Sequence, residues 1–340
     1  MRRQLVVAGL AWTLWLGTLA AGRVELPARL SDQAFWKLIV DASEPGGYFR
    51  AQDITNLTSN ELGYEYVIPD LLARAHAGAV YLGVGPEQNF TYIAALRPKL
   101  AIIFDIRRGN LDLQLMYKAI FELSRDRADF VALLFARARP AGLSPGLSAR
   151  QLFESFAALP SSDAMYRRNL AAIQDVLQKT HRLPLPASDL AGIRTIYQTF
   201  YVSGYSVRAS PTYADLMTAT DRAGVSRSYL ANEQNFAVLK DLEARNLIVP
   251  VVGDFAGPKA IRRVGAYLKA QGATVSAFYL SNVEQYLYQD GRWDAFCRNV
   301  ATLPLDGSSM FIRTTSAGGG FGRGFATSLG PMTDEIRVCR

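Results

Sequence analysis

The sequence predicts an α/β fold built around a mostly parallel, Rossmann-like sheet. Three observations support this prediction. Short apolar runs alternate with segments of helical periodicity, a glycine-containing turn follows the first of these runs, and an acidic residue ends the second. Such alternation is typical of parallel sheets with right-handed helical connections.

The expected elements follow in order along the chain. A polar cap and apolar residues at helical spacing predict a helix that begins at Ser31. A second helical rhythm over 61–75 contains Pro69, which should kink the helix or start a new one. The runs of strand length are 79–82, 100–104, 130–135, 247–252 and 274–280, and the helices between them are 89–96, 111–124, 232–244 and 258–271. We expect these five strands in the order 3-2-1-4-5.

Two further parts complete the predicted domain, which spans residues 30–340. A helical insertion over about 140–228, with one helix at 166–180, separates strands 3 and 4. A C-terminal pair around 310–312 and 335–338, with a glycine-rich segment between its members, should close the sheet in antiparallel fashion.

The turn after the first strand is the first candidate for a ligand site. Gly83 and Gly85 allow a sharp turn and a close approach of ligand to the backbone, and the N–H groups of the next helix attract negative charge. Twenty residues after Gly85, Asp105 ends the second strand, where a carboxylate can accept hydrogen bonds from both hydroxyls of a ribose. Arg107 and Arg108 could bind a carboxylate or phosphate, or could face solvent.

The turn departs from the dinucleotide fingerprint at two places. Gln88 or Asn89 fills the third glycine position, and Pro86 stands inside the turn. Both changes disfavour close passage of a pyrophosphate. A ligand with a ribose and no diphosphate fits better, and S-adenosylmethionine is the common example.

Residues 80–105 resemble the first motif and the acidic second-strand end of class I S-adenosylmethionine methyltransferases. A wider pattern, which covers most of the chain after residue 30, is similar to a poorly characterised bacterial family of methyltransferase-like proteins. It comprises Asn60-Glu61, the segment 83–90 and the segment 278–284. The resemblance implies S-adenosylmethionine as cofactor. The cofactor-binding residues it implies are Asn60, Glu61, Gly83, Gly85, Glu87, Asn89 and Asp105.

Polar residues after the later strands are candidates for the acceptor side. Asp254 follows the strand at 247–252, and Asn282 and Glu284 follow the last parallel strand, so all three should reach the same crevice. A carboxylate there could act as general base, although methyl transfer depends mainly on positioning. Asp254 could equally cap a helix before Pro258, and Glu284 could equally lie at a solvated helix start.

Composition and charge bear on other functions. Hydrophobic residues make up 49% and charged residues 20%, as in ordinary globular domains. The formal charge of +7 comes from scattered basic residues, so we expect no nucleic-acid surface. His76 and His181 lack ligand spacing, so we expect no metal site. Cys297 and Cys339 could form one late disulfide in an oxidising compartment or remain independent thiols.

The first 22 residues predict a leader. Arg2 and Arg3 precede an uncharged, mostly apolar run that ends in small residues at Gly22, which fits a secretory signal peptide. An uncleaved anchor or a buried helix remains an alternative, because the run is only slightly shorter than the roughly 20 apolar residues that span a bilayer. We therefore expect export, or anchoring through this segment, and no other membrane contact.

Export and the implied cofactor conflict, because S-adenosylmethionine is made in the cytoplasm. If the leader anchors the protein with its domain facing inward, methyl transfer remains possible. If the domain is released outside, the fold would hold another ligand or none. Two hypotheses follow: a methyltransferase-like enzyme of unknown acceptor, and an exported non-catalytic binding protein that retained the fold.

Overall fold

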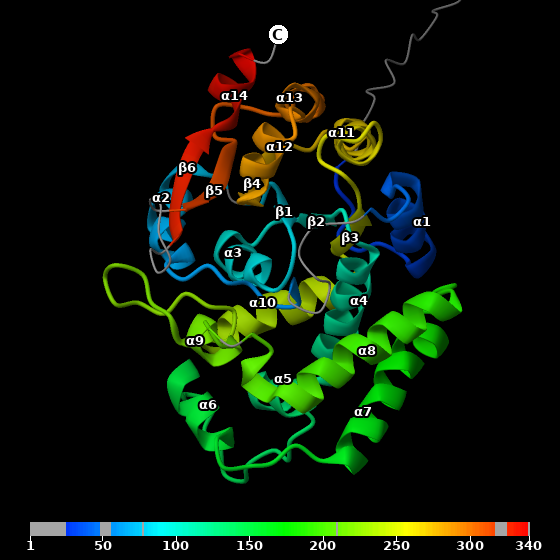
Figure 1. The fold of residues 1–340 in the computed structure, drawn as a ribbon, viewed down its shortest axis with the longest axis vertical. Coiled ribbons are helices and arrows are strands. Elements are labelled where there is room, and N and C mark those ends of the chain that lie inside the picture. Colours follow the sequence, from blue (N-terminus) through cyan, green and yellow to red (C-terminus); the bar gives the residue numbers. More distant parts are fainter. Residues whose placement is uncertain (1–24, 48–55, 77, 209, 317–324, 339–340) are drawn as a thin grey trace, which may run out of the picture.

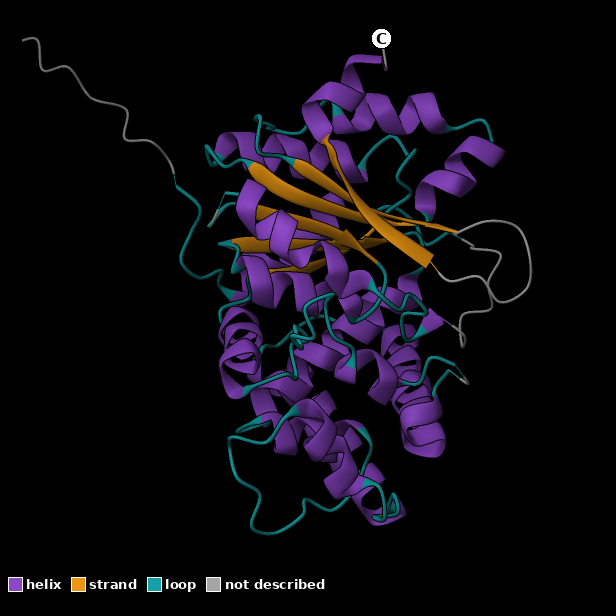
Figure 2. Ribbon diagram, turned by 90° about the vertical axis from the view of Figure 1, so that its left-hand side faces the viewer, coloured by secondary structure: helices purple, strands orange, loops and turns teal. Residues whose placement is uncertain are grey.

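A computed structural model of the chain describes residues 25–47, 56–76, 78–208, 210–316 and 325–338 (Figure 1). The predicted leader, residues 1–22, lies outside this part. Helices form layers on both faces of a single sheet (Figure 2). The fold class is therefore α/β and Rossmann-like, as the sequence predicts.

Six strands form the sheet in the order β3-β2-β1-β4-β5-β6. They are β1 (Val80–Val84), β2 (Leu100–Asp105), β3 (Ile248–Val252), β4 (Val275–Ser281), β5 (Met310–Ser316) and β6 (Phe325–Pro331). All neighbouring pairs are parallel except β5 and β6. The first four strands are buried along almost their whole length, which explains their nearly continuous apolar sequences.

One predicted strand is wrong. Residues 130–135 belong to helix α5 (Arg127–Leu134), and the N-cap residue Asp126 accepts a hydrogen bond from the backbone N–H of Asp129. A short apolar run does not by itself distinguish a buried strand from a buried helix, and here the N-cap favours the helix. β3 occupies the edge expected for 130–135, so the helical insertion lies between β2 and β3.

The last predicted strand is also wrong. Residues 335–338 lie at the end of helix α14 (Met332–Glu335) and in the short 3-10 helix η5 (Ile336–Val338). β6 precedes them, and its seven residues pair with all seven of β5. Since β4 occupies the other side of β5, no position beside it remains for 335–338.

Helices cover the two faces of the sheet in separate groups (Figures 1 and 2). One face carries α3 (Gln88–Leu96), α4 (Arg108–Leu123) and α10 (Glu233–Ala244). The other carries α11 (Ala260–Ala270), α12 (Val283–Gln289) and α13 (Trp293–Val300), and α1 (Asp32–Ala42) packs on β3 and α11. The predicted helix over 61–75 is a 3-10 turn, η2 (Tyr64–Val67), followed by α2 (Ile68–Arg74), which has Pro69 in its first turn.

The insertion is mostly helical, as predicted. Its elements are α6 (Ala149–Phe156), α7 (Asp163–Asp175), the π-helical turn η3 (Val176–Thr180), α8 (Ala187–Ser203), η4 (Gly204–Ser206) and α9 (Tyr213–Thr218). α7 and α8 pack on α4, so the insertion does not lie directly on the sheet but forms an additional layer beyond α3, α4 and α10 (Figure 1).

Two further observations concern the predicted leader and disulfide. Among the residues that the structure describes, no helix has both the length and the apolar character needed to cross a membrane. Cys297 in α13 is buried and disulfide-bonded, whereas Cys339 lies outside the described residues.

Candidate functional site

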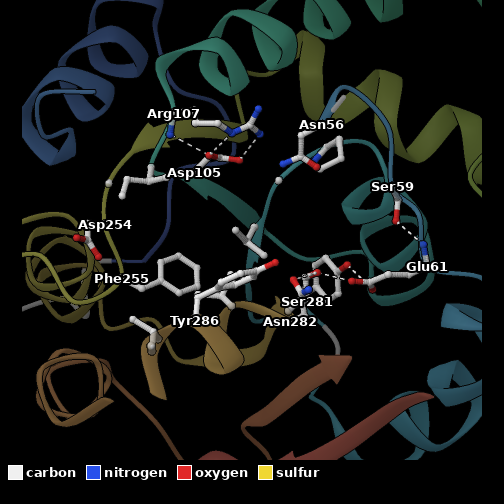
Figure 3. A pocket seen from close by; sticks show the side chains of 18 of the residues that line it. Asn56, Ser59, Glu61, Asp105, Arg107, Asp254, Phe255, Ser281, Asn282 and Tyr286 are labelled. Atoms are coloured by element: carbon white, nitrogen blue, oxygen red, sulfur yellow. Dashed lines mark hydrogen bonds and ion pairs between the residues drawn. The ribbon is translucent and has the colours of Figure 1, made fainter. Parts of the chain in front are cut away.

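A cavity of about 330 Å³ opens where the carboxyl ends of β1, β2, β3 and β4 meet (Figure 3). Its size falls in the range of small-molecule sites, roughly 300 to 1,000 Å³. The lining residues come from the segment before η2, the four strand ends, α12 and the turn after it, and the insertion. They are Asn56, Ser59, Asn60, Glu61, Val84, Gly85, Pro86, Asp105, Ile106, Arg107, Arg208, Gly253, Asp254, Phe255, Tyr279, Ser281, Asn282, Val283, Tyr286, Leu287, Asp290 and Arg292.

The turn after β1 borders this cavity through Gly85. Its φ of +79° lies in the left-handed region, where glycine is favoured, and a Cβ at this position would meet nothing within 4 Å. The backbone N–H of Gly85 donates to the carbonyl of Phe104 on β2, and the Gly85 carbonyl accepts from the Gln114 side chain. The turn is therefore held against β2 and α4 while its outer side stays open.

Gly83 and Asn89 support the turn from within and do not line the cavity. The Asn89 side chain donates to the carbonyls of Val84 and Pro86 at 2.9 and 2.7 Å, and it accepts from the Tyr81 hydroxyl at 2.9 Å. A Cβ on Gly83 would lie 1.8 Å from the Asn89 side-chain oxygen. Gly83 is thus required by the packing of Asn89, and the predicted cofactor contacts of these two residues are not supported by the cavity lining.

Asp105 lies at the end of β2 and lines the cavity, as predicted. Its carboxylate is held by Arg107: Oδ1 accepts from the backbone N–H at 2.9 Å and from Nε at 3.1 Å, and Oδ2 accepts from Nη2 at 2.8 Å. Both residues are about 5% exposed or less. Arg107 also lines the cavity, whereas Arg108 pairs with Asp189 at the start of α8.

Glu61 lines the cavity and is buried, with its carboxylate fully engaged. Oε2 accepts from Tyr279 on β4 at 2.8 Å, from Thr314 on β5 at 2.6 Å and from Gln88 at 3.2 Å. Oε1 accepts from the Ser281 hydroxyl. Glu61 therefore fixes the segment before η2 to β4 and β5, and its neighbour Asn60 lines the cavity beside it.

The end of β4 has a strained backbone. Ser281 has a φ of +52°, in the left-handed region that residues other than glycine rarely adopt, and its hydrogen bond to Glu61 holds it there. Asn282 follows as the N-cap residue of α12 and lines the cavity. Backbone strain of this kind is concentrated at functional sites.

Glu87 is fully buried at the N-cap position of α3 and does not line the cavity. Its carboxylate accepts from the backbone N–H of Ser59 at 3.1 Å, and burial raises its pKa to about 7. Glu87 therefore joins the segment before η2 to α3 from behind the lining, without direct access to a ligand.

Asp254 lines the cavity in the turn after β3. Oδ1 accepts from the backbone N–H of Ala256, and Oδ2 forms an ion pair with Arg292 at 2.5 Å. The carboxylate of Glu44 accepts from the backbone N–H groups of Lys259 and Ala260, so Glu44 caps the N-terminus of α11. The alternative prediction that Asp254 caps this helix is therefore wrong. Asp254 stabilises the turn before the helix through its hydrogen bond with Ala256.

Glu284 does not line the cavity. Its carboxylate forms an ion pair with Arg313 on β5 at 2.6 Å, and Arg313 also pairs with Glu335. Burial raises the pKa of Glu284, while Arg313 opposes that effect. These contacts give Glu284 a structural role between α12, β5 and α14.

Several lining residues are not predicted from the sequence, among them Asn56, Arg208, Tyr286, Asp290 and Arg292. Tyr286 and Phe255 lie across the cavity from Asp105 and Arg107 and contribute aromatic rings to its lining (Figure 3). A helical spacing of three and four residues from Val283 would have placed Tyr286 and Leu287 on one face of α12.

Within the described ranges, no group of three or more His, Cys, Asp or Glu residues is arranged to hold a metal ion. Three carboxylates of the lining are engaged within the protein. Asp105 and Asp254 form ion pairs with arginines, and Glu61 accepts hydrogen bonds from neutral groups. The cavity therefore offers hydrogen-bonding groups and aromatic surface, suited to a neutral or zwitterionic organic ligand.

No curated protein matches the chain. Residues 56–324, which include every residue of the cavity lining, match the model of a family described as a domain of unknown function, DUF7790. This match covers more than half of the chain, and the protein belongs to that family.

Proposed function

We propose that this cavity binds S-adenosylmethionine or a related nucleoside, and that the protein is methyltransferase-like. One observation carries the proposal: Gly85 and Asp105, at the ends of the adjacent strands β1 and β2, line the same open cavity. A glycine turn beside an acidic strand end is the arrangement that accommodates a ribose in Rossmann-like sheets.

Asp105 would accept hydrogen bonds from the ribose. An ionised carboxylate has about four acceptor positions, and Arg107 fills two on Oδ1 and one on Oδ2. Among the described residues, no second donor reaches Oδ2, so one position there could accept from a hydroxyl. Binding both ribose hydroxyls would require the Arg107 side chain to turn away, which frees one further acceptor position on each carboxylate oxygen.

The strand order suggests how the ligand would lie. The cavity runs from the end of β3 past β2 and β1 to the end of β4. With the ribose at Asp105, a planar base can pack on Phe255 and Tyr286, and the other end of the ligand would extend over Gly85 toward Asn282. Base stacking on an aromatic side chain is worth roughly 1 to 3 kcal/mol.

Catalysis, if the acceptor enters beside Asn282, would depend on alignment of acceptor and methyl group. The Asp254 carboxylate is engaged by Arg292, and Glu284 lies outside the lining. Among the three candidates named from the sequence, Asn282 is the neutral one, and it lines the cavity.

A second candidate function is a non-catalytic binding protein of the same fold, exported or anchored through residues 1–22. It is favoured by the ion pairs of Asp105 and Asp254 with arginines, because both carboxylates of the lining are already engaged within the protein. Mass spectrometry of small molecules that co-purify with the native protein separates the two. A methyl donor or its demethylated product supports the first candidate, and any other metabolite supports the second.

Titration calorimetry of the full chain with S-adenosylhomocysteine tests the proposed ligand. We expect binding by the wild type and at least tenfold weaker binding by Asp105→Asn, which keeps the shape of the side chain and removes its charge. Asp163→Ala, at an exposed site on α7, is the control and should bind as the wild type does. Absence of heat with the wild type would reject the proposal.

A further inference from the structure

The strand before α12, β4, is irregular where it reaches the cavity. Its pairing with β5 shifts in register between Tyr279 and Ser281, and Ser281 has the left-handed φ of +52°. Ser281 and the next residue, Asn282, both line the cavity. Irregularities of this kind redirect the side chains of a strand, and they recur beside functional sites. The conformation of Ser281 therefore determines where Asn282 lies.

One carboxylate holds Ser281 in this conformation. The Ser281 hydroxyl donates to Oε1 of Glu61. Oε2 of Glu61 accepts from Tyr279 on β4 at 2.8 Å and from Thr314 on β5 at 2.6 Å. Glu61 and Thr314 are buried, where hydrogen bonds are electrostatically stronger than in water. The acceptor for Ser281 is thus fixed to the two strands whose pairing is irregular, and its hydrogen bond offsets the cost of a left-handed residue.

The proton of the Ser281 hydroxyl is used within the protein. A hydroxyl carries one proton, and Glu61 is the nearer of the two acceptors that this hydroxyl contacts. The other acceptor is Oδ1 of Asn282, at 3.4 Å. Glu61, Ser281 and Asn282 lie beside one another in the cavity lining (Figure 3). The contribution of Ser281 to the site is therefore the direction of its backbone.

We infer that Ser281 is a positioning residue, held by Glu61, whose left-handed backbone places Asn282 against the end of the ligand opposite the base. This inference rests on the proposed function, in which that end extends over Gly85 toward Asn282. It also changes the role of Glu61, for which the resemblance in sequence implied direct contact with the cofactor. Glu61 acts on the ligand through Ser281, and the part of the ligand affected is the side arm beyond the ribose.

Two substitutions at Ser281 separate the role of its backbone from that of its hydroxyl. Ser281→Gly and Ser281→Ala both remove the hydrogen bond to Glu61, but only glycine adopts a left-handed conformation without strain. In titration calorimetry with S-adenosylhomocysteine, we expect Ser281→Gly to bind within about threefold of the wild type and Ser281→Ala to bind roughly tenfold more weakly. Adenosine has the base and the ribose but no side arm, so the wild type and both variants should bind it equally.

Arg182 offers the matched control. It also has a left-handed backbone, with a φ of +50°, and it lies exposed in the insertion, outside the cavity lining. Arg182→Gly and Arg182→Ala should therefore both bind S-adenosylhomocysteine as the wild type does.

Three outcomes would overturn the inference and leave the proposed function standing. The first is a tenfold loss of affinity in Ser281→Gly, which would mean that the hydroxyl is needed, and which counts even if Ser281→Ala does not fold. The second is wild-type affinity in Ser281→Ala, and the third is an equal loss for adenosine and S-adenosylhomocysteine in that variant, which would indicate a general distortion of the cavity. Failure of the wild type to bind S-adenosylhomocysteine would reject the proposed function and the inference together.

Discussion

Arg107 holds the carboxylate of Asp105 in the lining of the cavity: Nε and Nη2 of the guanidinium lie 3.1 and 2.8 Å from Oδ1 and Oδ2. The pair is almost completely buried, so each charge depends on the other for its stability. The orientation of the Asp105 carboxylate is thus fixed by Arg107, which a ribose that uses both its hydroxyls would have to displace.

Arg107→Gln should destabilise the protein by about 3 to 5 kcal/mol, because it leaves the buried carboxylate of Asp105 without its counter-charge. Urea unfolding followed by circular dichroism measures the loss. The double variant with Asp105→Asn should regain a large part of it, since no lone charge remains. If the single and double variants are equally unstable, the ion pair is not the cause.

Gly83→Ala and Gly85→Ala should differ in stability although the two residues belong to one turn. At Gly85 the added methyl group meets no protein atom, so the cost is that of a left-handed backbone, about 1 to 2 kcal/mol. At Gly83 it collides with the Asn89 side chain, which several hydrogen bonds hold in place, and overpacking adds about 1 to 3 kcal/mol plus the loss of those bonds.

Chemical denaturation of both variants checks this order. The double variant Gly83→Ala/Asn89→Ala is informative because it removes the obstructing side chain. Its loss of stability should be close to that of Asn89→Ala alone, and smaller than the sum of the two single losses. A larger loss for Gly85→Ala than for Gly83→Ala would contradict the assigned roles.

The parts of the site that the sequence predicted are those with local signals. Gly85, Asp105, Asp254 and Asn282 each follow a buried apolar strand, and parallel strands bring such ends to one edge. This geometry holds even though the strand predicted at 130–135 is a helix, because β3 occupies the same edge of the sheet and presents its own carboxyl end to the cavity.

The remaining parts depend on tertiary contacts that no local pattern encodes. Arg208 reaches the cavity from the insertion, and Arg292 does so by pairing with a residue 38 positions earlier. The direction of a side chain is equally hidden: Asn89 and Glu87 were expected to face the ligand, yet both are buried behind the turn because their hydrogen-bond partners lie there. The implied cofactor and the leader stay predictions.

His181 should make stability depend on pH through two carboxylates. Its ring nitrogens lie 2.7 Å from Glu122 on α4 and 2.7 Å from Asp32 on α1, and the hydrogen bond with Glu122 is the main cause of its raised pKa. Because the pKa of His181 is raised in the folded protein, protonated His181 adds to the free energy of unfolding. This contribution is complete below the ordinary pKa of 6.5 and is lost as pH rises through the folded-state pKa. His181→Gln should therefore cost most near pH 6 and progressively less at higher pH.

The two carboxylates set the lower limit of that window. The pKa values of Asp32 and Glu122 are lowered, with hydrogen bonds to His181 opposing burial, so their contribution is lost on acidification below their ordinary values. Thermal unfolding of wild type and His181→Gln between pH 4 and 9 measures the difference. A difference that stays constant from pH 6 to 9 would show that His181 does not titrate against these partners.

Asp112→Asn should stabilise the protein in alkaline solution. Asp112 is buried between α4 and α8, its Oδ1 has no hydrogen-bond partner among the described residues, and burial, reinforced by Asp189, raises its pKa to about 8. A folded-state pKa above the unfolded value of 3.8 means that the wild type loses stability as pH rises from about 4 through 8, because ionisation is easier in the unfolded chain.

Asparagine fills the same space without a charge, so the variant should be more stable than the wild type at pH 8.5, and the two should converge near pH 4. Arg108 limits the gain, since its charge favours ionised Asp112. Urea unfolding at pH 4.5 and 8.5 checks the prediction, and an asparagine variant that is less stable at both pH values would mean that the carboxylate is ionised and satisfied in the folded protein.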